Sequence, residues 1–260
     1  MELNKTRLTA IVSALAALLC ISAVSRAENN ESHDFFQKVR DGDLTKVREA
    51  IQNGANVNQA QNGTTALLIA SAKGYKDIAT LLLENGAHVD CRGGHEQTPL
   101  HVAAQKGHLQ IVEIFLGKRA KINSKMRGGQ TPLYLASQEG HDEILKLLVK
   151  NGADVNLTTD QSSSPLYVAA LFDHLEAVRF LIENHANLNQ QAQGGLTPLH
   201  IASLKGYTEI VRALVQKGAD MNVKTDSGKT PLDAAKAGGH EETVSFLESI
   251  GNKDQTSQRH

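Results

Sequence analysis

The stretch that decides the fold is Thr197-Pro198-Leu199-His200, because close copies of it recur along the chain at a fixed distance. The copies start 33 residues apart, at Thr98, Thr131, Ser164, Thr197 and Thr230, and Thr65 extends the series without the Pro-Leu step. A threonine or serine oxygen can cap the first turn of a helix, and proline fits that turn because its missing N–H has no partner there. The recurrence therefore predicts a short helix in every 33 residues.

Glycine marks the expected end of each of these helices, since it adopts a positive φ without steric cost. The glycines are Gly74, Gly107, Gly140, Gly206 and Gly239, and Asp173 takes the equivalent place in one copy. A second helix is predicted after each turn, because apolar residues recur at i, i+1, i+4 and i+5, as in Ile144, Leu145, Leu148 and Val149. A single helix pair cannot bury such a face, so successive pairs are expected to stack.

The 33-residue period and the Thr-Pro-Leu-His segment resemble the ankyrin repeat. The resemblance covers about residues 32–252. It implies an all-α fold, a solenoid of helix-turn-helix units with short β-hairpin loops. We count about seven units, of which the first and the last act as caps. In the last unit Thr243 and Glu248 occupy columns that are aliphatic elsewhere, so we expect that face to meet water.

The first 27 residues have the three parts of a secretory signal peptide. Lys5 and Arg7 precede an apolar stretch over residues 8–24, and small residues stand on either side of Arg26. We expect cleavage after Ala27, which would make the protein secreted or periplasmic. An uncleaved anchor is the alternative, although 17 residues are fewer than the roughly 20 that cross a bilayer. Residues 28–31 are then a short polar linker, and residues 253–260 a mobile polar tail.

Charge argues against two classes of partner. The chain has a formal net charge of -1, and the expected mature form holds 24 basic and 27 acidic side chains without a basic stripe. Nucleic acid and anionic membrane surfaces both require clustered positive charge. We therefore expect no nucleic-acid binding and no stable membrane insertion after signal cleavage. The mature chain keeps one cysteine, Cys91, so no internal disulfide is expected.

Catalytic and metal-binding motifs are missing from the sequence. It contains no GxSxG, HExxH or CxxC segment and no glycine-rich phosphate loop. Most of the 11 histidines recur at repeat positions, such as His101 and His200, and so are spread along the solenoid instead of converging as metal ligands must. The interpretation is a protein that is not an enzyme and has no cofactor; an enzyme with an unrecognised site is the remaining alternative.

The resemblance implies that a partner protein binds in the concave groove and at the hairpin tips. Apolar residues stand out at the end of one first helix, where Leu171 and Phe172 replace the polar residues of most copies, with Leu204 in the next repeat. Tyr134 and Tyr167 lie about one turn earlier and could extend an apolar binding spot, because exposed aromatic residues often anchor partners. Alternatively, Phe172 folds inward beside the Gly-to-Asp change.

Charged tip residues form a second candidate set, with Arg92, Lys125 and Arg127 as its members. Sequons for N-glycosylation begin at Asn30, Asn62 and Asn156. The functional hypothesis is a protein-binding scaffold or adaptor that acts outside the cytoplasm. Its alternative is an accessory factor dedicated to protecting or regulating one secreted or periplasmic enzyme.

Overall fold

The computed structural model describes residues 33–257, and for residues 252–257 the backbone alone. The predicted signal peptide and linker, residues 1–31, lie outside the described residues, as does the sequon at Asn30. The chain divides into two compact parts at the step from His88 to Val89, and each part is described by itself.

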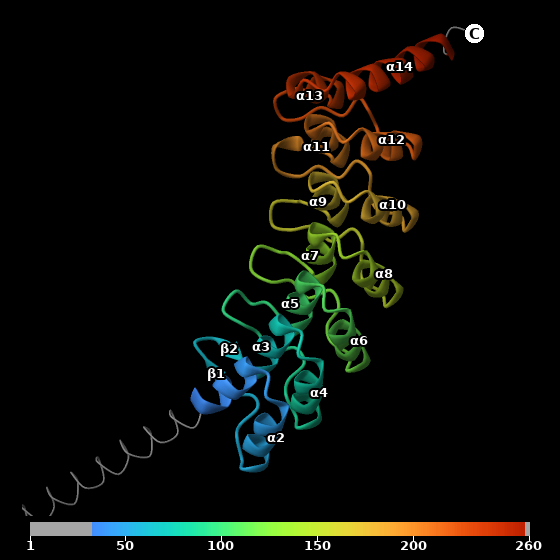
Figure 1. Cartoon of the computed structure of the whole chain (residues 1–260). Helices are drawn as coiled ribbons and strands as arrows, with labels where there is room; N and C mark the ends of the chain where they lie inside the picture. Colours follow the sequence, from blue (N-terminus) through green and yellow to red (C-terminus); the bar gives the residue numbers. More distant parts are fainter. Residues whose placement is uncertain (1–32, 258–260) are drawn as a thin grey trace, which may run out of the picture. The chain divides into compact units, whose positions relative to one another are not determined.

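The N-terminal part contains two helix pairs (Figure 1). The first helix occupies residues 33–41 of the described chain, and the elements after it are α2 Leu44–Gln52, β1 Ala60–Gln61, β2 Thr64–Thr65, α3 Ala66–Lys73 and α4 Lys76–Glu84. Phe35, Phe36 and Val39 of the first helix and Val47 of α2 are buried and form its core. The divergent first repeat therefore still has an apolar inner face.

The C-terminal part contains five helix pairs, and Figure 1 shows them as two rows of helices. The first helices are α5 Pro99–Lys106, α7 Pro132–Glu139, α9 Pro165–Leu171, α11 Pro198–Lys205 and α13 Pro231–Gly238. The second helices are α6 Leu109–Gly117, α8 Asp142–Lys150, α10 Leu175–Glu183, α12 Thr208–Gln216 and α14 Glu241–Ser257, and a short 3-10 turn, η1 Gln193–Gly195, precedes α11. Each first helix packs against the next first helix, as the expected stacking requires.

The first helices begin and end where the sequence predicts. The Thr131 hydroxyl caps α7 by accepting from the Tyr134 N–H at 3.1 Å, and α7 ends at Gly140 with φ 70°. Asp173 also has a left-handed backbone, with φ 63°, and α9 is 7 residues long where α7 has 8. A side chain with a Cβ is less stable than glycine in that conformation. The aspartate still keeps the left-handed turn that glycine makes in the other repeats.

The loops between repeats are short hairpins, as the resemblance implies. Among residues 33–257, strands pair only where β1 meets β2, in the register Ala60 opposite Thr65. The later loops are each closed by a main-chain bond such as Thr159 N–H to Ser163 O at 3.0 Å. Successive loops are also joined to each other, as by Asp160 N–H donating to Gly128 O at 3.1 Å. The main-chain groups of these loops thus pair between repeats as well as within a loop.

The last repeat corrects one expectation. Thr243 is fully buried, and its hydroxyl lies 2.9 Å from that of Thr208, so the prediction that this column meets water is wrong at Thr243. Glu248 does meet water and pairs with Lys236 at 2.8 Å. Helix α14 continues to Ser257. Within residues 33–257, every helix is too short or too polar to span a lipid bilayer.

Candidate functional site

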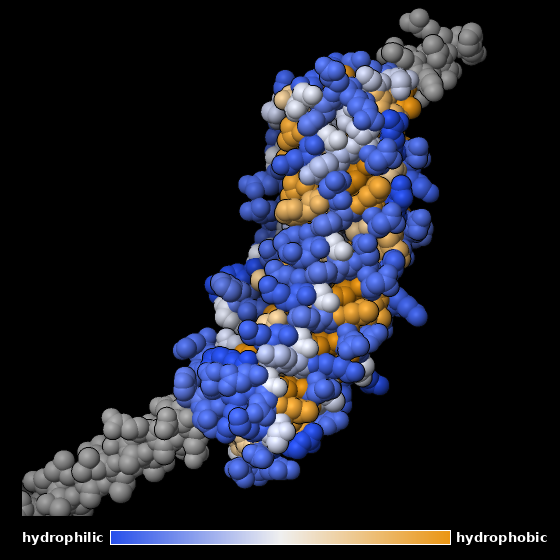
Figure 2. All heavy atoms as spheres, viewed as in Figure 1, coloured by the Kyte–Doolittle hydropathy of each residue, from blue (hydrophilic) through white to orange (hydrophobic). Residues whose placement is uncertain are grey.

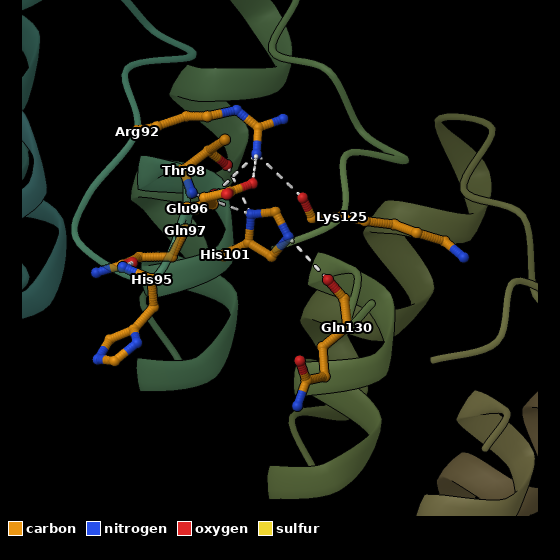
Figure 3. Close-up of polar contacts among 8 residues, drawn as sticks. All are labelled: Arg92, His95, Glu96, Gln97, Thr98, His101, Lys125 and Gln130. Atoms are coloured by element: carbon orange, nitrogen blue, oxygen red, sulfur yellow. Dashed lines mark hydrogen bonds and ion pairs between the residues drawn. The ribbon is translucent and has the colours of Figure 1, made fainter. Parts of the chain in front are cut away.

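His101 fastens one repeat of the C-terminal part to the next (Figure 3). Its Nδ1 accepts from the Thr98 N–H at 3.2 Å, and its Nε2 donates to the Gln130 carbonyl oxygen at 3.1 Å. One ring therefore completes the cap of its own helix and reaches the loop of the following repeat. Burial lowers the pKa of His101 to about 4, so the ring is neutral at physiological pH.

His200 makes the same arrangement three repeats later. It accepts from the Thr197 N–H at 3.3 Å and donates to the Lys229 carbonyl oxygen at 3.0 Å. Burial lowers the pKa of His200 as well. We call this pair of bonds, from the third residue of a first helix to its own cap and to the next loop, the histidine latch. The two conspicuous histidines thus have a structural role.

Tyr134 and Tyr167 occupy the latch position in the two repeats between these histidines. They leave the histidine latch unformed, because their single hydroxyl lies too far along the side chain to reach back to the cap; that of Tyr134 lies 3.5 Å from the Ser163 Oγ instead. Burial, with a smaller effect of the nearby Tyr134, raises the pKa of Tyr167, so this phenol stays protonated. The sequence drew attention to both tyrosines but not to the latch that they replace.

A groove of about 580 Å³ opens along these two repeats. We call it the tyrosine groove; its lining includes Gln130, Tyr134, Asp160, Gln161, Tyr167 and Leu171. First helices supply the apolar side of this lining, and loops supply the polar side. The groove therefore offers aromatic and aliphatic surface beside amide and carboxylate groups, which suits the recognition of a polypeptide segment.

The structure separates the predicted apolar residues into two groups. Leu171 lines the tyrosine groove together with Tyr134 and Tyr167. Phe172 and Leu204 do not line it, but they are 50% and 37% exposed. Phe172 does not fold inward, so the alternative placement is wrong. Figure 2 shows apolar surface between polar residues at the level of α9 to α12.

Arg92 and Lys125 hold loops together, a role that the sequence analysis missed. Arg92 donates to the Lys125 carbonyl oxygen at 3.2 Å, and the Lys125 Nζ donates to the Thr158 carbonyl oxygen at 2.7 Å (Figure 3 shows the first bond). Each donor stands 33 residues before its acceptor, so the repeat period was the available signal. The Arg127 side chain is exposed. Its main-chain N–H donates to the His95 carbonyl oxygen of the preceding loop at 2.9 Å.

Asparagine side chains make a further set of bonds between repeats. Asn156 donates its amide to the His185 carbonyl oxygen at 3.2 Å and accepts from the Asn187 N–H at 2.8 Å. Asn58, Asn123 and Asn189 accept from the next repeat in the same way. A glycan on Asn156 would replace one of the two amide hydrogens on the nitrogen that donates to His185, whereas Asn62 lies exposed at the β1–β2 turn with φ 51°.

Several other histidines bond to the preceding repeat. The Nε2 atoms of His141, His174 and His240 donate to carbonyl oxygens of the preceding first helices at 3.0, 2.9 and 3.0 Å. Across the described residues no three metal-ligating side chains come together. Cys91 is half-buried in the loop before α5.

Comparison with known proteins agrees with this repeat architecture. The family model "Ankyrin repeats (3 copies)" matches overlapping segments 35–126, 87–159, 123–192 and 166–258. The ankyrin repeat domain of human ASB11 is similar in structure, with a TM-score of 0.74 and 30% identity over 82% of this chain and 96% of that one.

A curated relative matches a shorter stretch. The acyl-CoA-binding domain-containing protein 6 homolog of Dictyostelium discoideum is 37% identical over 68 residues, which is 25% of this chain. The chain spans 24% of the length of that relative. The match of the family model to most of the sequence decides the assignment: the chain belongs to the ankyrin-repeat family.

Proposed function

We propose that the protein is a binding scaffold or adaptor that acts outside the cytoplasm and holds a partner protein in the tyrosine groove. The observation that carries the proposal is the replacement of the histidine latch by Tyr134 and Tyr167 in two consecutive repeats. The flanking histidines bond both to their own cap and to the next loop, whereas Tyr134 reaches the next loop alone, at Ser163, and both tyrosines line the groove. Tyrosine is a frequent anchor at protein interfaces.

The composition of the groove supports binding over catalysis. Its lining residues within the described chain include one carboxylate, Asp160, and no histidine, cysteine, lysine or arginine. Acid–base and nucleophilic catalysis each depend on at least two cooperating groups in reach of one substrate. Glutamine, serine and tyrosine side chains instead offer neutral hydrogen bonds to a polypeptide. The ankyrin fold is typical of protein-binding scaffolds, which supports the same conclusion.

Photo-crosslinking in the native cells tests this function. A photo-crosslinking amino acid in place of Gln161, which is exposed at the groove, should give a discrete protein adduct on illumination. The matched control is the same substitution at Lys146, which is exposed on the second helix α8 and does not line the groove. An adduct from position 161 alone supports the proposal. No adduct at 161, or equal adducts at both positions, contradicts it.

The place of action rests on the N-terminal pattern and has its own test. If residues 1–27 are removed as a signal peptide, the protein purified from its own cells begins at Glu28. N-terminal sequencing of that protein, together with cell fractionation, measures this directly. A chain that starts at Met1 and stays in the cytoplasm would overturn the location but would leave the groove as the binding surface.

A further inference from the structure

We propose that the segment held in the tyrosine groove is an extended stretch of a partner protein in which an arginine or lysine stands next to an apolar residue. This inference rests on the proposed function and adds the chemistry of the partner. Three features of the described residues carry it: an apolar wall, a carboxylate beside that wall, and amides that can pair with a peptide main chain.

The apolar wall selects an uncharged side chain. Tyr134, Tyr167 and Leu171 come from stacked first helices, α7 and α9, and lie half-buried along the groove. Burial keeps the Tyr167 phenol protonated, so the wall carries no charge. An aliphatic or aromatic side chain placed there removes apolar surface from water on both molecules, which stabilises the complex.

The carboxylate selects a cation next to that apolar side chain. Asp160 is exposed at the loop end of the groove, and its N–H is bonded to Gly128 O at 3.1 Å, which fixes its main chain. No ion pair among the side chains of residues 33–251 involves Asp160. The lining supplies no lysine or arginine to neutralise it. An arginine is the best match, because it pairs with a carboxylate and also stacks on tyrosine.

The amides favour a segment without helical structure. Gln161 and Gln193 line the groove, and their side-chain amides each offer donors and an acceptor. A peptide main chain in an extended form presents free N–H and C=O groups to such amides, whereas a helix has satisfied these groups internally. A volume of about 580 Å³ accommodates a few residues and not a whole domain.

Peptide selection tests the partner chemistry. Random 12-residue peptides displayed on phage are selected on the purified protein, and the enriched sequences should place Arg or Lys beside a leucine, methionine or aromatic residue. A synthetic peptide of that sequence should lose threefold to tenfold in affinity when Asp160→Asn removes the charge, about the effect of a partly exposed ion pair. A peptide with Gln in place of its Arg or Lys should bind the parent protein and the Asp160→Asn variant with affinities that differ by less than twofold.

A matched variant excludes a general effect of loop charge. Asp226 has the same position two repeats on, with its N–H bonded to Gly194 O at 3.1 Å, but it does not line the tyrosine groove. Asp226→Asn should change the affinity by less than twofold. Because aspartate and asparagine have nearly the same shape, both variants should melt like the parent protein.

Three outcomes would overturn the inference: an enriched sequence without a cation, an acidic one, or equal losses from Asp160→Asn and Asp226→Asn. The proposed function fails in a different way, since it fails when the crosslinker at position 161 gives no protein adduct in cells. A protein adduct at position 161 together with an acidic peptide consensus would therefore contradict the proposed partner chemistry. It would still support the scaffold function.

Discussion

Histidine and tyrosine at the third residue of a first helix differ in the number and reach of their polar atoms. The His101 ring has two nitrogens, so it bonds at once to the Thr98 N–H and to the Gln130 carbonyl oxygen. Tyrosine has one hydroxyl at the end of a longer side chain, and in Tyr134 it lies near Ser163. Histidine at this position therefore links successive repeats, whereas tyrosine leaves a surface to which a partner can bind.

The buried histidines should make the stability of the C-terminal part depend on pH. The pKa of His101 falls from 6.5 to about 4 on folding, so the unfolded chain takes up the proton first on acidification. The stability gained from the neutral ring is complete above pH 6.5 and is lost as the pH falls toward 4, by about 3 kcal/mol for this residue. His200 acts in the same direction.

Urea unfolding between pH 4 and pH 7 measures this dependence. The control is the double variant His101→Gln and His200→Gln, because glutamine can complete a capping box but does not titrate. The double variant should show a clearly flatter profile over this range. A parent profile as flat as that of the variant would show that the rings are not the source.

Restoring histidine in the groove should exchange binding for stability. Tyr134→His and Tyr167→His place a latch residue in both repeats, and each new latch should raise the free energy of unfolding by about 0.5–1.5 kcal/mol. The apolar wall is lost at the same time, so the crosslink from position 161 should disappear. A double variant that keeps the crosslink would show that the tyrosines are not the anchors.

At the scale of the elements, the loops depend on glycine where the next loop approaches closely. Gly129 has φ 82°, and a Cβ there would lie 2.6 Å from the main-chain nitrogen of Asp160. Gly152 has φ 92° but open space around a Cβ. Both positions disfavour a side chain through the backbone conformation, and only the first adds a collision with main chain.

The pair Gly129→Ala and Gly152→Ala separates these two costs. Gly152→Ala should lower the free energy of unfolding by about 1 kcal/mol, the cost of left-handed backbone. Gly129→Ala should lower it by clearly more, about 2–4 kcal/mol, since a loop must move. Chemical denaturation of both variants is the measurement, and equal losses would contradict the close approach of the two loops.

At the end of helix α9 the informative substitution is the reverse one, from a non-glycine residue to glycine. Asp173 holds φ 63° where the other first helices end at glycine. Asp173→Gly should therefore raise the free energy of unfolding by about 0.5–1 kcal/mol, because relief of backbone strain is partly offset by the greater freedom of glycine in the unfolded chain. Thermal melting checks it, and a lower melting temperature would mean that the aspartate side chain has a stabilising contact.

The helices could be predicted from the sequence because their signals are local. Caps such as Thr131 and stop residues such as Gly140 act within one turn, and the 33-residue period repeats them. The contacts between loops could not be predicted as readily, since Lys125 bonds to a carbonyl oxygen, a group that every residue carries. Thr243 was misread because the hydroxyl that satisfies it, on Thr208, is 35 positions away.

The groove was predicted only in part for the same reason. Tyr134, Tyr167 and Leu171 stand out against the repeat pattern, so their unusual character was visible in the sequence. Asp160 and Gln161 look like ordinary loop residues, and only the stacking of the loops brings them to the groove. Residues that depart from a repeat can be found by comparing copies, whereas residues that merely border them require the fold.

For the molecule as a whole, the last repeat should act as a cover for the C-terminal part. A chain that ends after residue 229 lacks α13 and α14 and exposes apolar residues such as Val211 and Leu214, which are fully buried in the complete chain. Its free energy of unfolding should fall by about 5 kcal/mol, and it should self-associate. Urea unfolding and light scattering measure both effects, and a chain ending at residue 257 is the control.

The hydrogen bonds between repeats affect how the sequence of such a chain can evolve. The histidine latch, the Lys125 bond and the Asn156 bonds all end on peptide groups of the neighbouring repeat, not on particular side chains. A neighbouring repeat can therefore change its side chains, or be exchanged or duplicated as a unit, and still form these hydrogen bonds. New surface residues such as Tyr134 and Tyr167 can then arise in central repeats without a compensating substitution in the adjacent repeat.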